Sequence, residues 1–101
     1  MSRPLKIVFS KTGDMRFVSH LDLIRLFQRA VRRAGMPVTL TQGFSPRLKI
    51  SITRALKLGV ESSGEEAVFH MDSHMRPGDF TVAMNAALPE GVRIISAEEM
   101  S

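Results

Sequence analysis

Basic side chains are concentrated in one part of the chain, where they could bind phosphate groups or an acidic partner. Residues 16–57 contain nine lysines and arginines against one acid, Asp22, which gives this segment a formal charge of +8. The remaining residues contain five basic side chains against nine acids, so their formal charge is −4. A basic block joined to an acidic remainder favours contact with nucleic acid or with an acidic protein.

Four arginines of this block share one side of a predicted helix. At 100° per residue they fall on an arc opposite the apolar residues of the same segment. Arginine forks match phosphate oxygens, but a charged helix face is also the ordinary solvated surface of a globular domain. Phosphate contact, docking to an acidic protein and plain solvation stay open for this arginine stripe, which consists of Arg25, Arg29, Arg32 and Arg33.

A loop after this helix is the second candidate for binding. Its glycine permits a turn that other residues would strain, and its proline makes the exit rigid. The loop lacks the pattern of a Walker A or dinucleotide-binding loop, which argues against ATP. It could present amides and charges to a phosphate, or it could be a rigid turn with Phe44 in the core. The residues concerned are Gln42, Gly43, Phe44, Pro46, Arg47 and Lys49.

The histidines are the remaining candidates for chemistry. His20 follows a predicted helix cap, a position from which an imidazole could act as a general base. Its neighbours Ser19 and Asp22 are already explained by capping, so a catalytic partner is not evident. His70 and His74 are four residues apart but straddle a strand end without a carboxylate cluster, and we therefore predict no metal site.

Composition limits the classes of protein that the chain can be. Its 101 residues, 44% apolar and 24% charged, suffice for one globular domain with a core. The absence of cysteine excludes disulfides, thiolate metal sites and thiol nucleophiles, and it is compatible with a reducing cytoplasm. No apolar run approaches the roughly 18 residues of a membrane span, so we expect a cytoplasmic protein without a membrane segment.

Strands and helices must position these side chains, and both have clear signals. Alternating apolar and polar residues predict four strands, at residues 5–10, 47–53, 66–71 and 92–97. The first helix has Ser19 as its N-cap and ends before Gly35, which suits a left-handed C-terminal position. The second starts at Pro77 and ends before Pro89. The order β-α-β-β-α-β predicts an α+β fold, the ferredoxin-like split βαβ arrangement, as a single domain over residues 1–101.

The connecting segments and the open sheet face complete this picture. We predict a short extended piece at residues 15–18, an additional edge strand at residues 38–41, a turn at residues 58–64 and a polar tail at residues 98–101. The sheet face opposite the helices would be basic but would lack aromatic rings for stacking bases, which favours phosphate or shape recognition. Its predicted residues are Lys6, Lys49, Ser51, His70 and Arg93.

Five sequence motifs resemble a bacterial domain of unknown function, the radical SAM-linked protein family. They are RFVSHLDL at residues 16–23, RAVRRAGMPV at 29–38, TQGFSPRLKIS at 41–51, ALKLGVES at 55–62 and ALPEG at 87–91. Members of that family are about twice as long, so the chain resembles their N-terminal half. The motifs imply a shared surface formed by His20, Asp22, Gln42, Gly43, Phe44, Pro46 and Arg47.

The resemblance also implies partners. Members lie beside, or are fused to, B12-binding-type radical SAM proteins, so the iron–sulfur cluster and S-adenosylmethionine would belong to that partner and no cofactor to this chain. Neighbouring genes for ribonuclease E/G and ribosomal proteins imply an RNA or ribosome context. A weaker likeness, at the level of the fold, is to the ferredoxin-like endoribonucleases of CRISPR RNA processing.

Three functional hypotheses follow. The first is an accessory, non-catalytic domain that presents RNA or a ribosomal substrate to a radical SAM enzyme, with the arginine stripe, Arg47 and Lys49 on phosphates. The second is a protein-interaction module that docks an acidic surface of that partner. The third is a metal-independent ribonuclease that uses His20.

Overall fold

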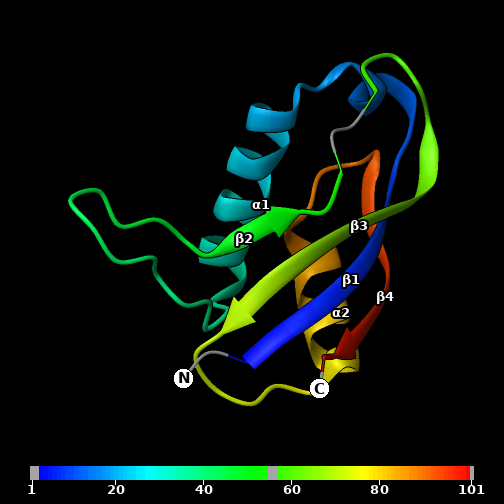
Figure 1. Ribbon diagram of the computed structural model, residues 1–101. Helices are drawn as coiled ribbons and strands as arrows, with labels where there is room; N and C mark the ends of the chain where they lie inside the picture. Colours follow the sequence, from blue (N-terminus) through cyan, green and yellow to red (C-terminus); the bar gives the residue numbers. More distant parts are fainter. Residues whose placement is uncertain (1–2, 55–56, 101) are drawn as a thin grey trace.

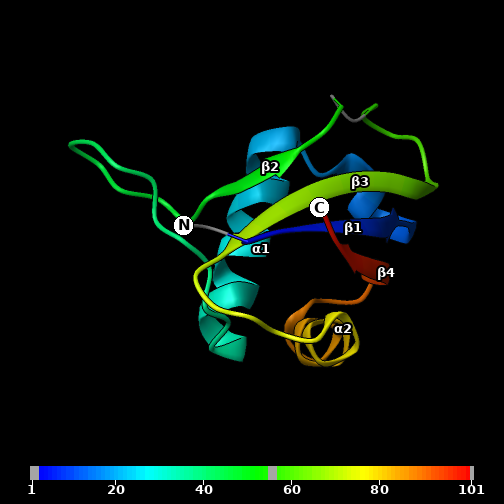
Figure 2. The same ribbon diagram turned by 60° about the horizontal axis from the view of Figure 1, so that its bottom comes forward.

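A four-stranded antiparallel sheet with both helices on one face forms the domain (Figures 1 and 2). The computed structural model describes residues 3–54 and 57–100. Its sheet has the strand order β2-β3-β1-β4, which together with the chain order is the ferredoxin-like split βαβ arrangement. The predicted fold is thereby confirmed. The elements are β1 (Arg3–Lys11), a 3-10 helix η1 (Gly13–Phe17), α1 (His20–Ala34), β2 (Ile50–Ile52), β3 (Ser62–Met71), α2 (Pro77–Ala87) and β4 (Val92–Glu99).

The core lies between the sheet and the helices, and four phenylalanines run through it. Phe9 of β1 meets Phe27 of α1 edge to face, with ring centroids 5.2 Å apart. Phe27 meets Phe69 of β3 at 5.4 Å, and Phe69 meets Phe80 of α2 at 5.2 Å, again edge to face. This is the geometry that aromatic quadrupoles prefer. The chain of rings therefore fixes both helices against the two central strands.

The first helix forms as its sequence predicts. The Ser19 hydroxyl accepts a hydrogen bond from the Asp22 amide at 3.2 Å, and Gly35 ends the helix with a φ of 68°. The apolar face of α1 buries Leu23, Leu26, Phe27, Ala30 and Val31. Neither α1 nor α2 is long and apolar enough to cross a bilayer, and no other helix in the described residues is.

The segment that we expected to be extended at residues 15–18 instead lies largely within η1. The Thr12 amide donates to the Gly91 carbonyl at 2.8 Å, and the Met15 amide donates back to the Thr12 carbonyl at 3.2 Å. A turn before β4 thus holds the end of β1, and the chain coils into one 3-10 turn instead of extending. The prediction of an extended segment was wrong because the hydrogen bond from Thr12 to Gly91 joins residues nearly eighty positions apart.

Strand boundaries also differ from the predicted ones. β3 begins at Ser62, inside the expected turn, and β4 continues through Glu99, into the expected polar tail. The strand expected at residues 47–53 is reduced to Ile50–Ile52. No edge strand forms at residues 38–41, where single bridges join Val38 to Met71 and Leu40 to Leu48. The chain between α1 and β2 thus pairs in part with the end of β3 and in part with itself.

Candidate functional site

A narrow ribbon of residues 39–49 projects from the domain beside β2 (Figure 1). Its base is fixed to β3, because the Thr39 amide donates to the His70 carbonyl at 2.7 Å and the His70 amide donates to the Lys49 carbonyl at 3.1 Å. The Lys49 amide donates to the Thr39 carbonyl at 2.7 Å, which joins the two arms of the ribbon. The ribbon is thus an extension of the sheet with a defined root.

A second pair of hydrogen bonds closes the ribbon below its tip. The Thr41 amide donates to the Arg47 carbonyl at 2.6 Å, and the Arg47 amide donates to the Thr41 hydroxyl at 3.1 Å. These bonds hold residues 42–46 as a loop away from the body of the domain. Five residues that the sequence selected lie on this tip or its neck, and all are exposed: Gln42, Gly43, Phe44, Pro46 and Arg47.

Phe44 is fully exposed at the tip of the ribbon, so the interpretation that placed it in the core is wrong. The core is already filled by the four phenylalanines that meet edge to face, and the neck bonds hold the tip outside it. Leu40, on the arm leading to the tip, is 56% exposed as well. Covering a phenylalanine side chain is worth about 1.5–3 kcal/mol, so a partner that buries Phe44 gains that much.

Lys49 and His70 lie together at the root of the ribbon. Partial burial lowers the pKa of His70 below its usual value of 6.5, and the nearby Lys49 ammonium lowers it further. His70 is therefore neutral at physiological pH, and Lys49 is the cation at this root. Lys49 is exposed and can reach an anionic ligand that lies along the ribbon.

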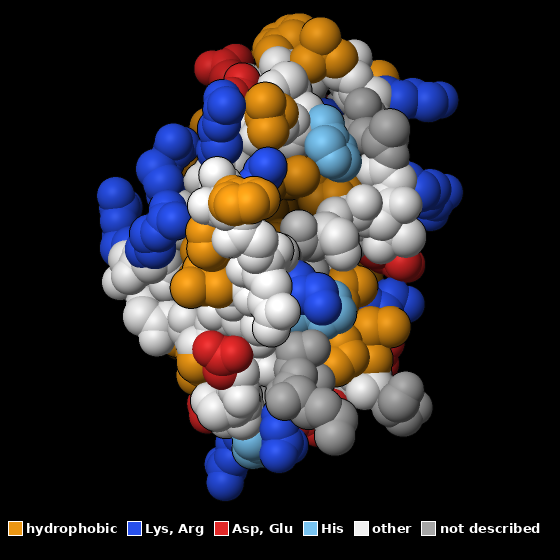
Figure 3. Space-filling view, turned by 60° about the vertical axis from the view of Figure 1, so that its left-hand side comes forward, with side chains coloured by type: hydrophobic (Ala, Val, Ile, Leu, Met, Phe, Trp, Pro, Cys, Tyr) orange, Lys and Arg blue, Asp and Glu red, His pale blue; other side chains and the backbone are white. Residues whose placement is uncertain are grey.

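The arginine stripe is exposed along α1, and Figure 3 shows Lys and Arg side chains gathered on that side of the molecule. Arg25 contacts Asp22 at 3.5 Å, so the first arginine of the stripe is partly neutralised. The other three form no ion pair within residues 3–54 and 57–100. Figures 1 and 2 place α1 and the ribbon toward the β2 edge of the sheet, away from β4.

A shallow groove separates α1 from α2 beside this stripe. It has a volume of about 260 Å³ and a floor of small and apolar side chains, among them Leu26, Ala86 and Leu88. Arg29 and Arg33 line the same groove. Two cations beside an apolar floor fit a side chain or helix of an acidic protein.

We compared the chain with models of known protein families. The family described as "Uncharacterized protein conserved in bacteria (DUF2344)" matches residues 5–101. The chain belongs to this family. No curated protein matches it. The DUF2344 match includes the ribbon, the arginine stripe and the groove, so all three are parts of the family's domain. The family's description names no activity.

His20 stands apart from the ribbon in this DUF2344 domain. It is the first residue of α1, at the opposite end of that helix from the chain leading to Thr39, and its side chain is exposed. Its side chain has no hydrogen-bond or ion-pair partner within the described parts of the chain. A general base usually needs a partner that orients its ring. The structure therefore gives the ribonuclease hypothesis no supporting contact.

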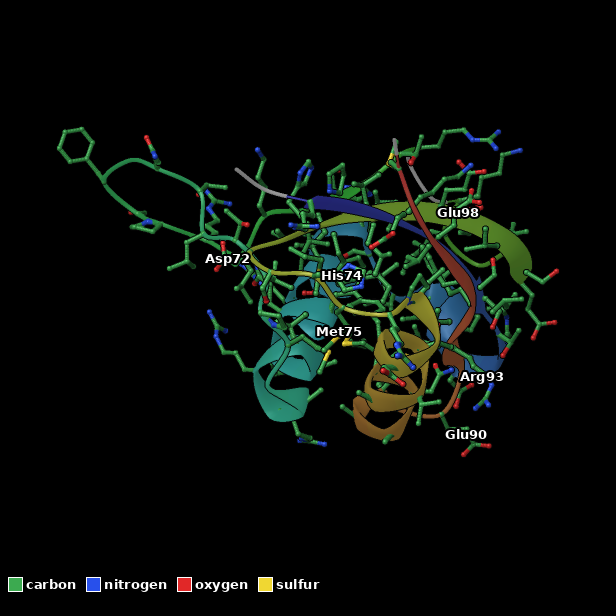
Figure 4. The ribbon with its side chains drawn as sticks, turned by 90° about the horizontal axis from the view of Figure 1, so that it is seen from below. Asp72, His74, Met75, Glu90, Arg93 and Glu98 are labelled. Carbon is green, nitrogen blue, oxygen red and sulfur yellow. The ribbon has the colours of Figure 1, made fainter. Side chains whose placement is uncertain are left out.

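The open sheet face of the DUF2344 domain is less basic than predicted. The Lys6 ammonium lies 3.7 Å from a Glu66 carboxylate oxygen and 4.0 Å from a Glu98 oxygen. His74 does not join His70, because its Nδ1 lies 3.0 Å from Glu99 on β4; Figure 4 shows His74 on the segment that leads into α2. No group of three potential His or carboxylate metal ligands occurs in the described residues.

Sequence reasoning missed two notable side chains of this DUF2344 domain. Leu40 adds apolar surface to the ribbon, and only the self-pairing of the ribbon reveals that it is exposed. Lys11 is buried to 1% exposure. A signal for Lys11 existed, because the inward alternation of Leu5, Ile7 and Phe9 continues to position 11.

Proposed function

We propose that the domain is an accessory, non-catalytic RNA-binding module whose projecting ribbon and arginine stripe hold an RNA strand. The observation that carries the proposal is the placement of Phe44. A fully exposed aromatic ring stands at the end of a hydrogen-bonded ribbon, with Arg47 on its neck and Lys49 at its root. Proteins that bind single strands combine such rings with cations along the backbone.

Each part of the ribbon has a role in this proposal. The Phe44 ring stacks on one unpaired base, a contact worth about 1–3 kcal/mol in single-strand binding. Arg47 donates a guanidinium fork to a phosphate, and Lys49 adds a point charge. Stacking of this kind does not depend on the RNA sequence, because every base has an aromatic face. The open sheet face carries no phenylalanine in its described strands, so recognition would pass from the sheet to the ribbon.

The arginine stripe extends the phosphate contacts beyond the ribbon. Arg29, Arg32 and Arg33 carry no internal counter-ion in the described chain, so phosphates need not displace a carboxylate from them. Like charges on one helix face repel each other by a few tenths of a kcal/mol per pair. A bound strand relieves that repulsion, which couples the stripe to RNA binding.

The partner and the setting rest on the resemblance to radical SAM-linked proteins. We propose that the domain presents RNA or a ribosomal substrate, in the cytoplasm, to a radical SAM enzyme. The cysteine-free chain offers no thiolates to an iron–sulfur cluster. In this arrangement the partner would supply the cluster, S-adenosylmethionine and all redox chemistry.

The groove between α1 and α2 favours a second candidate, a module that docks an acidic surface of the radical SAM partner. Arg29 and Arg33 flank an apolar floor there, and protein interfaces combine such a floor with charges at its rim. Co-purification of the two proteins after complete nuclease digestion would favour this candidate. Loss of the complex on nuclease treatment would favour RNA.

Salt-dependent binding of a labelled single-stranded RNA to the full chain tests the RNA proposal. With six basic groups on phosphates, raising the salt from about 50 to about 200 mM should weaken binding on the order of 10² to 10³-fold. Reversing Arg29 and Arg32 to glutamate should remove most of the affinity. The matched control reverses Arg76 and Arg93, which are exposed outside the stripe and change net charge equally. Absent or salt-insensitive binding would overturn the proposal.

A further inference from the structure

Lys11 is the one charged side chain that is buried among the residues described. It is the last residue of β1 and follows Leu5, Ile7 and Phe9 on the inward face of that strand. Figure 1 places this end of β1 beside the chain that leads into β3, at the end of the sheet farthest from both termini. Lysine is rarely buried unless a group of opposite charge accompanies it.

The partners of the Lys11 ammonium are neutral. It donates to the Lys57 carbonyl at 3.0 Å and to the Arg16 carbonyl at 3.4 Å. It forms no ion pair with any carboxylate in the described part of the chain. Two carbonyl dipoles orient the ammonium, but no carboxylate of the described residues lies within ion-pair distance to compensate its charge.

A cavity of about 450 Å³ adjoins this ammonium and holds two further cations, Arg54 and Lys57. Glu61 and Glu65 also line it, but neither forms an ion pair with these cations. Glu61 instead accepts the Gly13 amide at 2.7 Å, and Glu65 accepts the Ser62 hydroxyl at 3.2 Å. Three cations that form no ion pair in the described residues therefore line one space, and each of the two acids beside them already accepts one hydrogen bond.

We propose that this cavity binds the phosphate group of a phosphorylated sugar, either free or at the 5′ end of an RNA. A phosphate offers three or more acceptor oxygens to three separate cations, whereas a carboxylate offers two. The volume lies within the range of small-molecule sites, so it exceeds what a bare anion needs. The unused lone pairs of Glu61 and Glu65 can accept hydroxyl groups of the sugar.

The cavity is separate from the ribbon, so this inference does not rest on the proposed function. β3 runs from Ser62 at the cavity to His70 at the root of the ribbon. Eight residues of extended strand span about 26 Å at about 3.3 Å per residue. Loss of one site therefore leaves the other in place.

Thermal unfolding and calorimetric titration of the full chain test the proposal. Inorganic phosphate should raise the melting temperature above that in chloride of equal ionic strength, and ribose 5-phosphate should bind more tightly than ribose. Arg54→Ser should weaken ribose 5-phosphate binding about tenfold or more, because it removes a charge-assisted hydrogen bond. Arg93→Ser, an exposed arginine on β4, is the matched control.

Lys11→Met separates binding from a purely structural clamp. If the variant folds, binding of ribose 5-phosphate should be lost; if it does not, Arg54→Ser decides. Equal effects of phosphate and chloride, or unchanged titration of Arg54→Ser, would overturn the proposal. An RNA with a 5′-phosphate that binds more tightly than the same RNA with a 5′-hydroxyl identifies the RNA terminus as the source. Equal binding of the two RNAs, with ribose 5-phosphate bound, identifies a free metabolite.

Discussion

Asn85 and Ile94 exchange two hydrogen bonds that join α2 to the edge strand β4. The side-chain Nδ2 of Asn85 donates to the Ile94 carbonyl at 2.9 Å, and the backbone amide of Ile94 donates to the side-chain Oδ1 of Asn85 at 2.8 Å. Ile94 lies where the pairing of β1 with β4 changes register. One side chain thus occupies both peptide groups of a residue on the outer strand, which blunts an edge that could pair with another chain.

Replacing Asn85 by aspartate should destabilise the domain. An ionised aspartate cannot donate to the Ile94 carbonyl, so one partly buried acceptor is left without its partner, at a cost of about 1–3 kcal/mol. Urea unfolding measures the change in the free energy of unfolding. Val82→Asp, at a 73% exposed position of α2, is the control for adding the same charge to this helix. Equal stability of the two variants would show that the Ile94 contact contributes nothing.

The turn before β4 predicts a second stability effect. Gly91 has a φ of 97°, and a Cβ there would lie 2.7 Å from Met15 Cγ and 2.8 Å from the Thr12 carbonyl oxygen. Gly91→Ala should therefore cost more than about 1 kcal/mol, because backbone strain and a clash with main chain act together. Gly78→Ala in α2 meets no atom within 4 Å and should be neutral or stabilising. Comparable melting temperatures for both variants would contradict this account.

His70 predicts that stability falls as the solution becomes acidic. Burial, and then Lys49, lowers its pKa in the folded protein below the 6.5 of an exposed histidine. The unfolded chain therefore binds the proton at a higher pH than the folded protein does. Stability from this group is complete above about pH 6.5 and is lost as the pH falls from there through the folded pKa.

Urea unfolding at a series of pH values measures this loss, and His70→Gln should reduce it. Lys49→Met should raise the His70 pKa only in part, as followed by NMR titration, because burial is the larger cause. A His70 pKa at or above 6.5 in the unmodified protein would refute the assignment.

Local signals sufficed for the regular elements of this fold. Ser19 and Gly35 define α1 through contacts with residues at most four positions away, and the alternation of Leu5, Ile7 and Phe9 sets the face of β1. The arginine stripe follows from helical spacing in the same way. These features were predicted because the physical cause lies within a few residues of the effect.

Features that depend on distant contacts were not predicted. η1 forms because Thr12 bonds Gly91, and Lys11 is held by the Lys57 carbonyl, 46 positions along the chain. The exposure of Phe44 depends on a core that other phenylalanines fill. In sequence, an aromatic residue between glycine and proline fits a buried turn or a projecting tip equally well, and only tertiary packing decides between them.

Phe44 gives the sharpest test of the ribbon. Phe44→Ala should weaken binding of single-stranded RNA by about 5- to 150-fold, because stacking on one base contributes about 1–3 kcal/mol. The melting temperature of the Phe44→Ala variant should equal that of the unmodified protein, since removing a fully exposed side chain leaves no cavity. Phe44→Leu keeps an apolar tip but removes the aromatic face, so it should resemble alanine in RNA binding. If leucine instead keeps the RNA affinity of phenylalanine, apolar contact without an aromatic face is enough, and the stacking role of Phe44 is wrong.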